Sequence, residues 1–452
     1  MPPKLEIVIV GAGLSGLSAA IQCALSGHSV TVLESARELA EVGAGIQLTP
    51  NATRLLQTWG VYENIQGPCE PRTCTIYNYK GTVLAHEKDF DKNCRRKYNS
   101  PFTDCHRVDL QRALVERAED LGVHVVLGSR LVGIEFPEGT SMTNGNSTYT
   151  ATNNSGSVDG RARITLANKQ NLTADLIVGA DGLWSTCRSI LLNRADAPLP
   201  TGDLAYRIVL SLDQIPLSDT KLRNMVQNPD VRFWIGPDAH AVAYSLRGGT
   251  MLNLVLLVPD DLEEGVAKAD GDLAEMKKLF EGWDGVLTTL LTHVHQVSKW
   301  KLMHRDPLPT WTHPSSRLVL IGDACHPMLP YLAQGANSSI EDGAALGALL
   351  DSSKNPHFKS DKDLEGVLRL FEKIRKERGE GIARETFAQR RDFHLRDGAE
   401  QKERDELFRA WMDGAGTGKF PSRWTCPIVQ KWLYGYDALG EVDEAVRNQM
   451  SV

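Results

Sequence analysis

The sequence predicts an α/β fold that combines a layer of parallel strands, a second and mostly antiparallel β-sheet domain, and a C-terminal helical tail. Strand-like and helix-like stretches alternate at the N-terminus, which is typical of parallel βαβ units. Between about residues 200 and 300, apolar residues recur with a period of two, which favours antiparallel strands. Residues 362–412 are charged and helical in pattern, and an aromatic-rich tail follows them. At about 150 residues per domain, the 452 residues are expected to form two or three domains.

The first βαβ unit is predicted by three consecutive segments. Residues 5–10 form a continuous apolar run, residues 14–26 have a helical pattern, and residues 29–33 are again β-branched. Further along, a Lys-Gly turn at residues 80–81 separates the runs TCTIYNY and TVLAHE. This pattern predicts a hairpin outside the parallel layer.

Later segments indicate that the first domain is discontinuous. After the period-two strands VRFWIG, AVAYSL and MLNLVLLV, residues 317–322 return to the buried-strand pattern and residues 338–351 continue as a helix. Residues 137–160 are rich in Ser, Thr, Asn and Gly, which predicts an exposed hairpin tip. The expected domains are a discontinuous α/β domain at 1–66, 104–187 and 303–400, a β-sheet domain at 67–103 and 188–302, and a C-terminal helical cap at 401–452.

Composition and charge exclude several classes of function. Hydrophobic residues make up 42% of the chain and charged residues 24%, which is typical of a folded globular protein. The 50 Lys and Arg residues against 57 Asp and Glu residues give a net charge of −7, so no basic field favours nucleic acid or an anionic membrane as a partner. The sequence contains no run of about 18 apolar residues, so no membrane-spanning segment is expected. A small molecule is the expected partner, and the choice between monomer and homodimer stays open.

The eight cysteines are scattered along the chain. They form no CxxC pair and lie near no His cluster, so no zinc or other metal site is expected. The N-terminal run LEIVIV is far shorter than the apolar core of a signal peptide. We therefore expect an intracellular, cytoplasmic protein with reduced thiols.

A glycine-rich segment follows the first predicted strand and opens the first predicted helix. Gly11, Gly13 and Gly16 have the GxGxxG spacing, in which glycines let the backbone approach a pyrophosphate at the positive end of a helix. Glu34 ends the next strand 18 residues after Gly16, close to the ~20 expected for the acid that binds an adenosine ribose. Strand, helix and acid are in register, which favours a dinucleotide site over simple helix packing. The motif does not distinguish FAD from NAD.

Two further strand ends carry polar residues. The apolar run that starts at Leu176 ends in an Asp181-Gly182 turn, which alone is typical of an ordinary turn. Residues 322–337, GDACHPMLPYLAQGAN, end a third strand and lead into a helix. Backbone N–H groups at that helix start stabilise negative charge, although the segment alone fits an ordinary capped helix equally well.

Together these segments resemble the class A flavoprotein monooxygenases, specifically the salicylate-hydroxylase-like branch abundant in fungal metabolism. The GxGxxG motif with Glu34, the GADG turn and the GDACHPMLPYLAQGAN stretch match in order, as do EVGAGIQL at 41–48 and HRVDL at 106–110. The resemblance extends from residue 5 to WLYGYDA in the tail. It implies a Rossmann-like FAD-binding domain of the glutathione-reductase type beside the antiparallel substrate domain.

The resemblance also implies which residues bind the cofactor FAD. The ADP part of FAD is implied to contact Gly11, Gly13, Gly16 and Glu34, and the ribityl and ring region to contact Arg107, Ala44 and Gly45. Asp323 is implied to bind the ribityl hydroxyls, and the pyrimidine edge of the flavin to lie near Gly335, Ala336 and Asn337. Asp181 is associated with both FAD and NAD(P)H. One departure is Ala333, where the family more commonly has Gly.

The reaction implied by the resemblance is monooxygenation of an aromatic substrate. NADPH or NADH reduces FAD, O₂ adds to form a C4a-hydroperoxide, and one oxygen atom passes to a phenol, salicylate-like or indole ring. For the substrate we expect Arg207 first and Tyr244 second, because relatives use an arginine on such a strand, sometimes with a tyrosine, to hold a phenolate. A nearby cation favours ionisation of the phenol. The structural alternatives are a salt bridge for Arg207 and a cross-strand aromatic for Tyr244.

The resemblance implies a monooxygenase of fungal secondary metabolism. Two other classes of function stay open. An FAD-dependent oxidase or dehydrogenase acting on an amine or alcohol would reduce the flavin with its own substrate and leave NAD(P)H untouched. A non-catalytic carrier with the flavin fold would have no need of the GDACHP…QGAN segment, since fold alone does not fix function.

Overall fold

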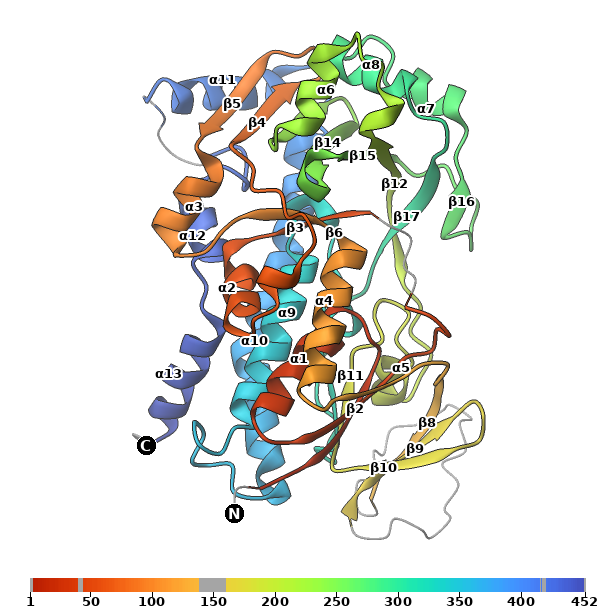
Figure 1. Ribbon diagram of the computed structural model, residues 1–452, viewed down its shortest axis with the longest axis vertical. Coiled ribbons are helices and arrows are strands. Elements are labelled where there is room, and N and C mark those ends of the chain that lie inside the picture. Colours follow the sequence, from red (N-terminus) through yellow and green to blue (C-terminus); the bar gives the residue numbers. More distant parts are fainter. Residues whose placement is uncertain (1–2, 40–43, 138–159, 415, 417–419, 451–452) are drawn as a thin grey trace.

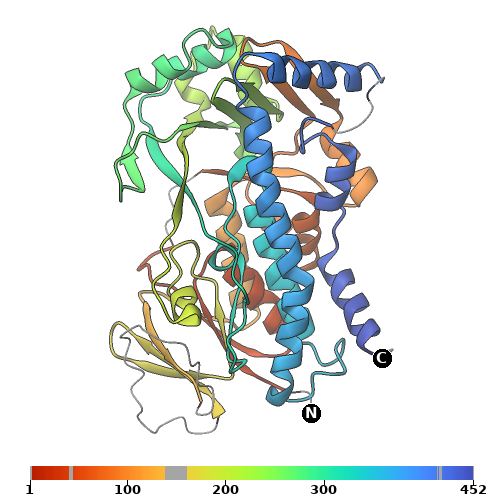
Figure 2. The same ribbon diagram turned by 180° about the vertical axis from the view of Figure 1, so that it is seen from behind.

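The computed structural model describes residues 3–39, 44–137, 160–414, 416 and 420–450. Figure 1 shows an elongated molecule with a parallel sheet and its helices towards one end and a larger sheet towards the other. Helix α10 (Leu364–Phe393) runs along much of the long axis, as the view from behind in Figure 2 shows.

The parallel layer is a five-stranded sheet with the strand order β18-β11-β1-β2-β7. Its strands are β1 (Glu6–Val10), β2 (Ser29–Leu33), β7 (His124–Val126), β11 (Leu176–Gly179) and β18 (Leu318–Leu320). β1 lies between β2, which follows it closely in the chain, and β11, which comes much later. The parallel βαβ unit predicted from the sequence is confirmed, and the layer is assembled from distant parts of the chain.

Helices α1 (Leu14–Leu25) and α9 (Gly335–Leu349) pack against each other on this layer. A Cβ at Gly343 would lie 2.4 Å from the nitrogen of Ala19, and a Cβ at Gly347 would lie 2.6 Å from a side-chain atom of Gln22. The absence of side chains at these two glycines allows the close approach. Because later residues of α9 meet later residues of α1, the two helices run parallel, and their positive N-terminal ends lie near each other.

The larger sheet has eight strands in the order β16-β17-β12-β15-β14-β13-β4-β5. They are β4 (Thr73–Asn78), β5 (Val83–Lys88), β12 (Leu199–Ser211), β13 (Val231–Gly236), β14 (Ala239–Leu246), β15 (Met251–Pro259), β16 (Lys268–Asp270) and β17 (Ser298–His304). All neighbouring pairs are antiparallel except β4 with β13. This confirms the mostly antiparallel second sheet and the β4–β5 hairpin.

The two faces of this sheet have different neighbours. Apolar residues on one face form a core with α6 (Thr220–Gln227), α7 (Leu273–Leu279) and α8 (Gly285–Thr292). On the other face, Phe233 and Tyr244 pack in a second core that includes Leu332 and Phe393. The second face therefore looks towards the start of α9 and towards α10.

Smaller elements connect the two sheets. The strands β3 (Gly45–Leu48) and β6 (Thr103–His106) form an antiparallel pair, and β8 (Leu131–Glu135), β9 (Ala162–Leu166) and β10 (Asn171–Ala174) form a three-stranded sheet. The remaining α-helices are α2 (Pro50–Thr58), α3 (Phe90–Tyr98), α4 (Arg107–Asp120), α5 (Thr186–Leu192), α11 (Ala399–Met412), α12 (Pro427–Tyr434) and α13 (Ala438–Met450). The predicted hairpin tip at 137–160 lies almost entirely outside the described residues.

Two further findings bear on the expectations from composition. All eight cysteines are free and buried. None of the helices in the described part of the chain combines the length and the apolar character needed to cross a membrane.

Candidate cofactor and substrate site

The three glycines of the GxGxxG segment differ in what surrounds them. Gly11 has a φ of +108°, and a Cβ there would lie 2.4 Å from the carbonyl oxygen of Ala180. A Cβ at Gly16 would lie 2.0 Å from the carbonyl oxygen of Gly11. A Cβ at Gly13, in contrast, would meet nothing within 4 Å. Gly11 and Gly16 are therefore required for packing, whereas Gly13 leaves open space at the start of α1.

Glu34 lies beside this loop. Its Oε2 accepts a hydrogen bond of 2.9 Å from the backbone N–H of Ala12, and its Oε1 accepts one of 2.8 Å from that of Ala36. Gln111, which the sequence did not single out, donates from Nε2 to the Ala12 carbonyl at 2.9 Å. Glu34 and Gln111 together fix the loop between β1 and α1. The contact of Glu34 with a ribose stays a prediction.

Helix α1 offers an anion-binding end. Its N-cap, Gly13, has no side chain to satisfy the first N–H groups, and the first turn contains no acidic residue. The hydrogen bond from Leu17 N to Gly13 O at 3.0 Å begins the helix. The N–H groups before Leu17 therefore have no partner within the helix, and a Cβ at the neighbouring Gly13 would meet no protein atom within 4 Å.

Asp181 lies at the end of β11, where its Cα is 3.2 Å from the position of a Cβ on Gly11. Its Oδ2 accepts hydrogen bonds from the backbone N–H groups of Thr186 at 2.7 Å and Cys187 at 3.0 Å, and its Oδ1 accepts one from Ser185. Asp181 thus caps α5 beside the glycine loop. Its contacts with FAD and NAD(P)H stay a prediction.

Asp323 and Arg107 come together from distant segments. Asp323 keeps a solvent-accessible side although it lies deep among protein atoms. Burial raises the pKa of Asp323, and the positive charges of His326 and Arg107 oppose that rise. The backbone N–H of Arg107 also donates to the Ala44 carbonyl at 3.0 Å. The residues predicted for the ribityl and ring region are therefore grouped in one place, although residues 41–43 of the EVGAGIQL segment lie outside the described part.

The start of α9 offers a second set of N–H groups. The N-cap residue Gln334 makes no side-chain cap, and the first hydrogen bond runs from Ser338 N to Gln334 O at 2.7 Å. The N–H groups of Gly335, Ala336 and Asn337 come before that bond and have no partner within the helix. They form a positive helix end of the kind predicted for the flavin's pyrimidine edge.

The side-chain amide of Asn337 is engaged by protein partners, including the Ala333 carbonyl, which accepts from Nδ2. It is fully buried, its Oδ1 accepts from Thr49 N at 2.9 Å, and its Nδ2 donates to Gln47 O at 3.0 Å. Asn337 therefore joins α9 to β3 through its amide. Only its backbone N–H is left for a cofactor contact.

A buried charged cluster supports the start of α9, and the sequence did not predict it. Oδ2 of Asp342 accepts from Gly322 N at 2.9 Å and lies 2.5 Å from His326 Nε2, while its Oδ1 accepts from Arg375 Nε at 2.8 Å. Burial alone would raise the pKa of Asp342, but the charges of His326 and Arg375 lower it to about 2. Cys325, His326 and Asp342 place possible metal-ligand atoms within 4.8 Å of one another. Both oxygens of Asp342 are already engaged by protein donors, so hydrogen bonding accounts for this cluster.

The larger sheet meets the small β3–β6 pair at Gly45. The backbone N–H of Gly45 donates to Asn253 Oδ1 at 2.8 Å. A Cβ at Gly45 would lie 2.5 Å from Cε2 of Tyr244, which pairs with Asn253 across β14 and β15. The sequence analysis did not single out Asn253 as a site residue. Its position as a lone polar residue inside the apolar run MLNLVLLV could have indicated a specific hydrogen bond. The contact brings Tyr244 directly beside the predicted flavin segment.

Arg207 lies on the same face of the larger sheet as Tyr244. In the register of β12, β15 and β14, Arg207 pairs with Val255 and Val255 pairs with Val242, so the three side chains form one row across the sheet. All three are only half-buried although their strands are central. The Arg207 guanidinium carbon lies 4.7 Å from the centroid of the Trp300 ring. The structure therefore presents an accessible, mainly apolar surface on which Arg207 and Lys268 share the Trp300 ring.

Tyr244 stays a neutral phenol on this face. Burial raises its pKa well above the ordinary value, the charges of Asp104 and Cys105 raise it further, and Arg207 opposes the shift. Neighbouring Ala205 and Leu257 pack against Leu329 and Tyr331, which immediately precede α9. The surface with Arg207 and Tyr244 is thereby placed opposite the start of α9.

A second polar cluster, also missed by the sequence analysis, holds the segment before α9 in place. The Tyr331 hydroxyl donates to Asp203 on β12, and Arg390 on α10 forms an ion pair with the same carboxylate. The Trp424 indole N–H donates to the Tyr331 carbonyl at 2.9 Å. The contacts of Asp203 therefore join β12 to α10 and to the segment before α9.

Comparisons with known proteins agree with this arrangement. The model of the family described as "FAD binding domain" matches residues 4–357. The FAD-dependent monooxygenase OpS4 of Beauveria bassiana (strain ARSEF 2860) is 46% identical over 447 residues, covering 98% of each chain. The 3-hydroxybenzoate 6-hydroxylase of Polaromonas naphthalenivorans (strain CJ2) is 28% identical, covering 96% of this chain and 97% of that one. A salicylate hydroxylase solved as a substrate complex has a similar fold, with a TM-score of 0.75 at 20% identity and 98% coverage of each chain.

The family match covers both strand ends that carry the glycine loop and Asp323, and the Beauveria relative extends the likeness through the C-terminal helices. The predicted resemblance and the mixed α/β fold are confirmed. The chain therefore belongs to the class A FAD-dependent monooxygenases and is a flavoprotein oxidoreductase.

Proposed function

We propose that this monooxygenase uses NADPH or NADH to reduce FAD and inserts one atom of O₂ into an aromatic ring of the phenol, salicylate-like or indole class. The observation that carries the proposal is the stacked Arg207 on an accessible apolar surface opposite the start of α9. The relative named 3-hydroxybenzoate 6-hydroxylase supports an aromatic substrate. The fungal source of OpS4 supports a role in fungal metabolism, and secondary metabolism is the branch we propose.

FAD fits the residues that the structure brings together. The open space at Gly13 and the uncapped start of α1 would take its pyrophosphate, and Glu34 would bind its ribose. Asp323 would accept hydrogen bonds from the ribityl hydroxyls, and the N–H groups at the start of α9 would face the pyrimidine edge. When bound, FAD supplies electron storage and the activation of O₂.

The chain's own residues would bind and orient the substrate. Arg207 would hold a phenolate or carboxylate, and its positive charge would favour the ionised phenol and so increase the electron density of the ring. Val242 and Val255 in the same row would contact the ring and keep water out. Tyr244, neutral at ordinary pH, would offer a hydroxyl at the edge of this surface.

The proposal is tested by measuring NADPH and NADH consumption with a panel of phenols, salicylates and indoles. We expect at least one of them to accelerate consumption and to yield a product carrying one oxygen atom from O₂. Arg207→Met should raise the KM of that substrate at least about tenfold, because a charge-assisted contact is lost. The matched control is Lys268→Met, since Lys268 lies over the same Trp300 ring at 4.4 Å.

Two outcomes would replace the proposal. Flavin reduction by an amine or alcohol, with NAD(P)H inert, would show an oxidase or dehydrogenase. Tight FAD binding without reduction by either route would show a carrier. An unchanged KM in Arg207→Met would reject the assigned substrate surface while leaving the monooxygenase reaction to be judged by the product.

A further inference from the structure

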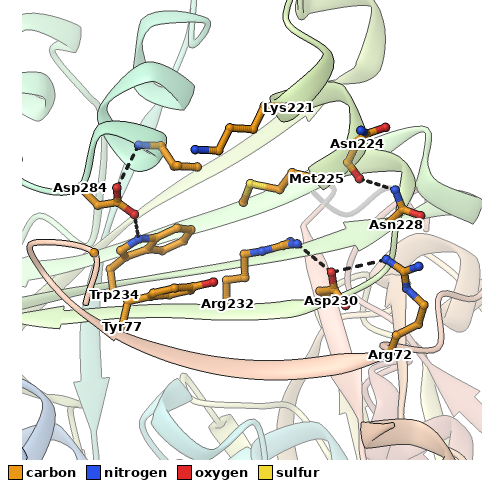
Figure 3. Close-up of a pocket in the computed structure, with 12 residues that line it drawn as sticks. Arg72, Tyr77, Lys221, Asn224, Met225, Asn228, Asp230, Arg232, Trp234 and Asp284 are labelled. Atoms are coloured by element: carbon orange, nitrogen blue, oxygen red, sulfur yellow. Dashed lines mark hydrogen bonds and ion pairs between the residues drawn. The ribbon is translucent and has the colours of Figure 1, made fainter. Parts of the chain in front are cut away.

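A separate cavity of about 480 Å³ lies on the other face of the larger sheet. Figure 3 shows its floor on β4 and β13 and its wall on α6, with Asp284 at one end and Arg72 at the other. Ligand pockets in proteins have volumes of roughly 300–1,000 Å³. The cavity is large enough for a small organic molecule.

This cavity is distinct from the proposed substrate surface. Successive residues of a strand point to opposite faces of the sheet. On β13, Arg232 and Trp234 line the cavity, whereas Phe233 between them packs in the core that contains Tyr244. The sheet itself therefore separates a ligand in this cavity from Arg207 and from the flavin segment.

The floor of the cavity is a pair of stacked aromatic rings. Tyr77 and Trp234 are register neighbours on β4 and β13, with ring centroids 5.7 Å apart and an interplanar angle of 19°. The Trp234 indole N–H donates to Asp284 Oδ2 at 2.7 Å, which fixes that ring. Met225 extends over the rings from α6 (Figure 3). Flat aromatic surfaces facing a thioether favour a planar, apolar ligand.

The cavity also contains cationic groups that are not fully engaged by the protein. The Lys221 side chain extends from α6 above the rings (Figure 3), is exposed, and forms no ion pair with another described residue. Arg232 donates from Nη2 to Asp230 at 2.7 Å, but its Nη1 is shielded from solvent without a hydrogen-bond partner. A shielded, unpartnered guanidinium N–H is costly unless an acceptor binds to it.

Two acidic groups limit the charge of the ligand. Asp230 is already shared by Arg232 and by Arg72 at 3.7 Å. Asp284 accepts from Trp234 and from the backbone N–H of Val286 at 3.2 Å. With Lys221, Arg232 and Arg72 against these two carboxylates, the cavity has a formal charge of +1. A ligand with one negative charge balances this charge, whereas a polyphosphate would be repelled by the carboxylates of Asp230 and Asp284.

We propose that this cavity is a second binding site, for a planar aromatic carboxylate. The ring would lie against the accessible side of Tyr77, which is itself stacked on the buried Trp234 ring, and the carboxylate would accept a hydrogen bond from the exposed Lys221 with the Arg232 guanidinium nearby. A neutral ring would leave the Lys221 ammonium without a partner, and a saturated acid would lose the stacking on Tyr77. The proposal does not depend on Arg207 being the substrate residue.

The test is isothermal titration of the FAD-loaded full-length protein with benzoate, cyclohexanecarboxylate, benzyl alcohol and inorganic phosphate. The cavity site should take benzoate in preference to the other three. Lys221→Met should raise the benzoate Kd of this site at least about tenfold. Tyr77→Leu should remove the preference for benzoate over cyclohexanecarboxylate. The control Lys402→Met, at an exposed position on α11, should behave as the unmodified protein.

Binding near the flavin is followed separately by the change in flavin absorbance. Arg207→Met should affect that change and leave the cavity site intact, so failure of the proposed function and failure of this site give different results. A benzoate isotherm that is identical in Lys221→Met and in the unmodified protein would overturn the proposal. Equal binding of phosphate or cyclohexanecarboxylate at the cavity site would overturn the assigned ligand class.

Discussion

The guanidinium of Arg207 is stacked on the indole ring of Trp300, with 4.7 Å between the guanidinium carbon and the ring centroid. The two residues come from neighbouring antiparallel strands, β12 and β17. The stacking fixes the orientation of the Arg207 charge beside the apolar side chains of Val242 and Val255. A substrate anion bound there meets a cation that is already oriented, which lowers the entropic cost of binding.

Replacing Trp300 with Leu should therefore weaken substrate binding without removing the charge. A cation–π contact contributes about 0.5–2 kcal/mol, so the KM should rise by a factor of about 2 to 30 while kcat at saturation changes little. Steady-state kinetics with the best substrate of the panel measure both. A fall in kcat with an unchanged KM would contradict the role given to the stacking.

The glycine loop predicts two opposite kinds of defect. Gly16→Ala places a Cβ 2.0 Å from the Gly11 carbonyl oxygen, so we expect the apoprotein itself to be destabilised by about 1–3 kcal/mol or more. Gly13→Ala meets no protein atom within 4 Å, so the apoprotein should unfold as the unmodified protein does while FAD binding is weakened. Urea unfolding of both apoproteins and FAD titration separate the two effects. Unimpaired FAD binding in Gly13→Ala would show that the pyrophosphate lies elsewhere.

Gly45 tests the junction between β3 and the larger sheet. In Gly45→Ala, the new Cβ would come 2.5 Å from Tyr244 and 2.7 Å from Asn253. Either β3 or those side chains must move, at a cost of about 1–3 kcal/mol, and the flavin ring segment should shift with them. We expect a lower unfolding free energy and a higher FAD Kd. The double variant Gly45→Ala/Tyr244→Leu should recover part of both, and no recovery would argue against the contact.

The buried His326–Asp342 pair gives a pH-dependent prediction. Burial lowers the His326 pKa, but the charge of Asp342 and the hydrogen bond between them outweigh burial and raise it well above its ordinary value. The pair thus stabilises the folded protein fully when the pH is below about 6.5, the pKa of His326 in the unfolded chain. This stabilisation is lost as the pH rises through the higher pKa that His326 has in the folded protein. His326→Gln should cost about 3 kcal/mol at about pH 6 and less at about pH 9, measured by urea unfolding. A cost that grows with pH would contradict this charge state.

Ala333 has a φ of +49°, a left-handed conformation that disfavours a Cβ. The left-handed backbone strains Ala333 by about 1–2 kcal/mol. A Gly at this position would relieve that strain and would cost only ~0.4–1 kcal/mol, because it increases the conformational entropy of the unfolded chain. Ala333→Gly should therefore raise the unfolding free energy by up to about 1 kcal/mol. Ala336→Gly, inside the first turn of α9, should instead lower it, and thermal unfolding of the two apoproteins compares them. Equal shifts in both would rule out strain at Ala333.

Local patterns in the sequence predicted the parts of the site that depend on local structure. The spacing of Gly11, Gly13 and Gly16 directly after an apolar run specifies a turn between a strand and a helix, and the structure shows that turn. The period-two runs likewise predicted β13, β14 and β15. Hydrophobic periodicity and glycine positions report on neighbours in the chain, which is why they were sufficient here.

Contacts between distant segments could not be read in this way. Gly45 and Asn253 are 208 positions apart, and Arg375 reaches Asp342 from a different helix. Asn337 shows the opposite limit, because its place at a helix start suggested a cofactor contact while its side chain is used to hold Thr49. Such pairings depend on how helices and sheets pack, and a single sequence does not encode that packing in a local pattern.

The most direct test of the proposed function is anaerobic reduction of the FAD-loaded protein by NADPH and by NADH, each with and without the aromatic panel, followed by mixing with heavy-isotope O₂. We expect one aromatic ligand to accelerate bleaching of the flavin and, after O₂ is added, to be recovered with a single labelled oxygen atom. Flavin that neither nicotinamide reduces under any ligand, or a product without labelled oxygen, would contradict the proposed monooxygenase reaction.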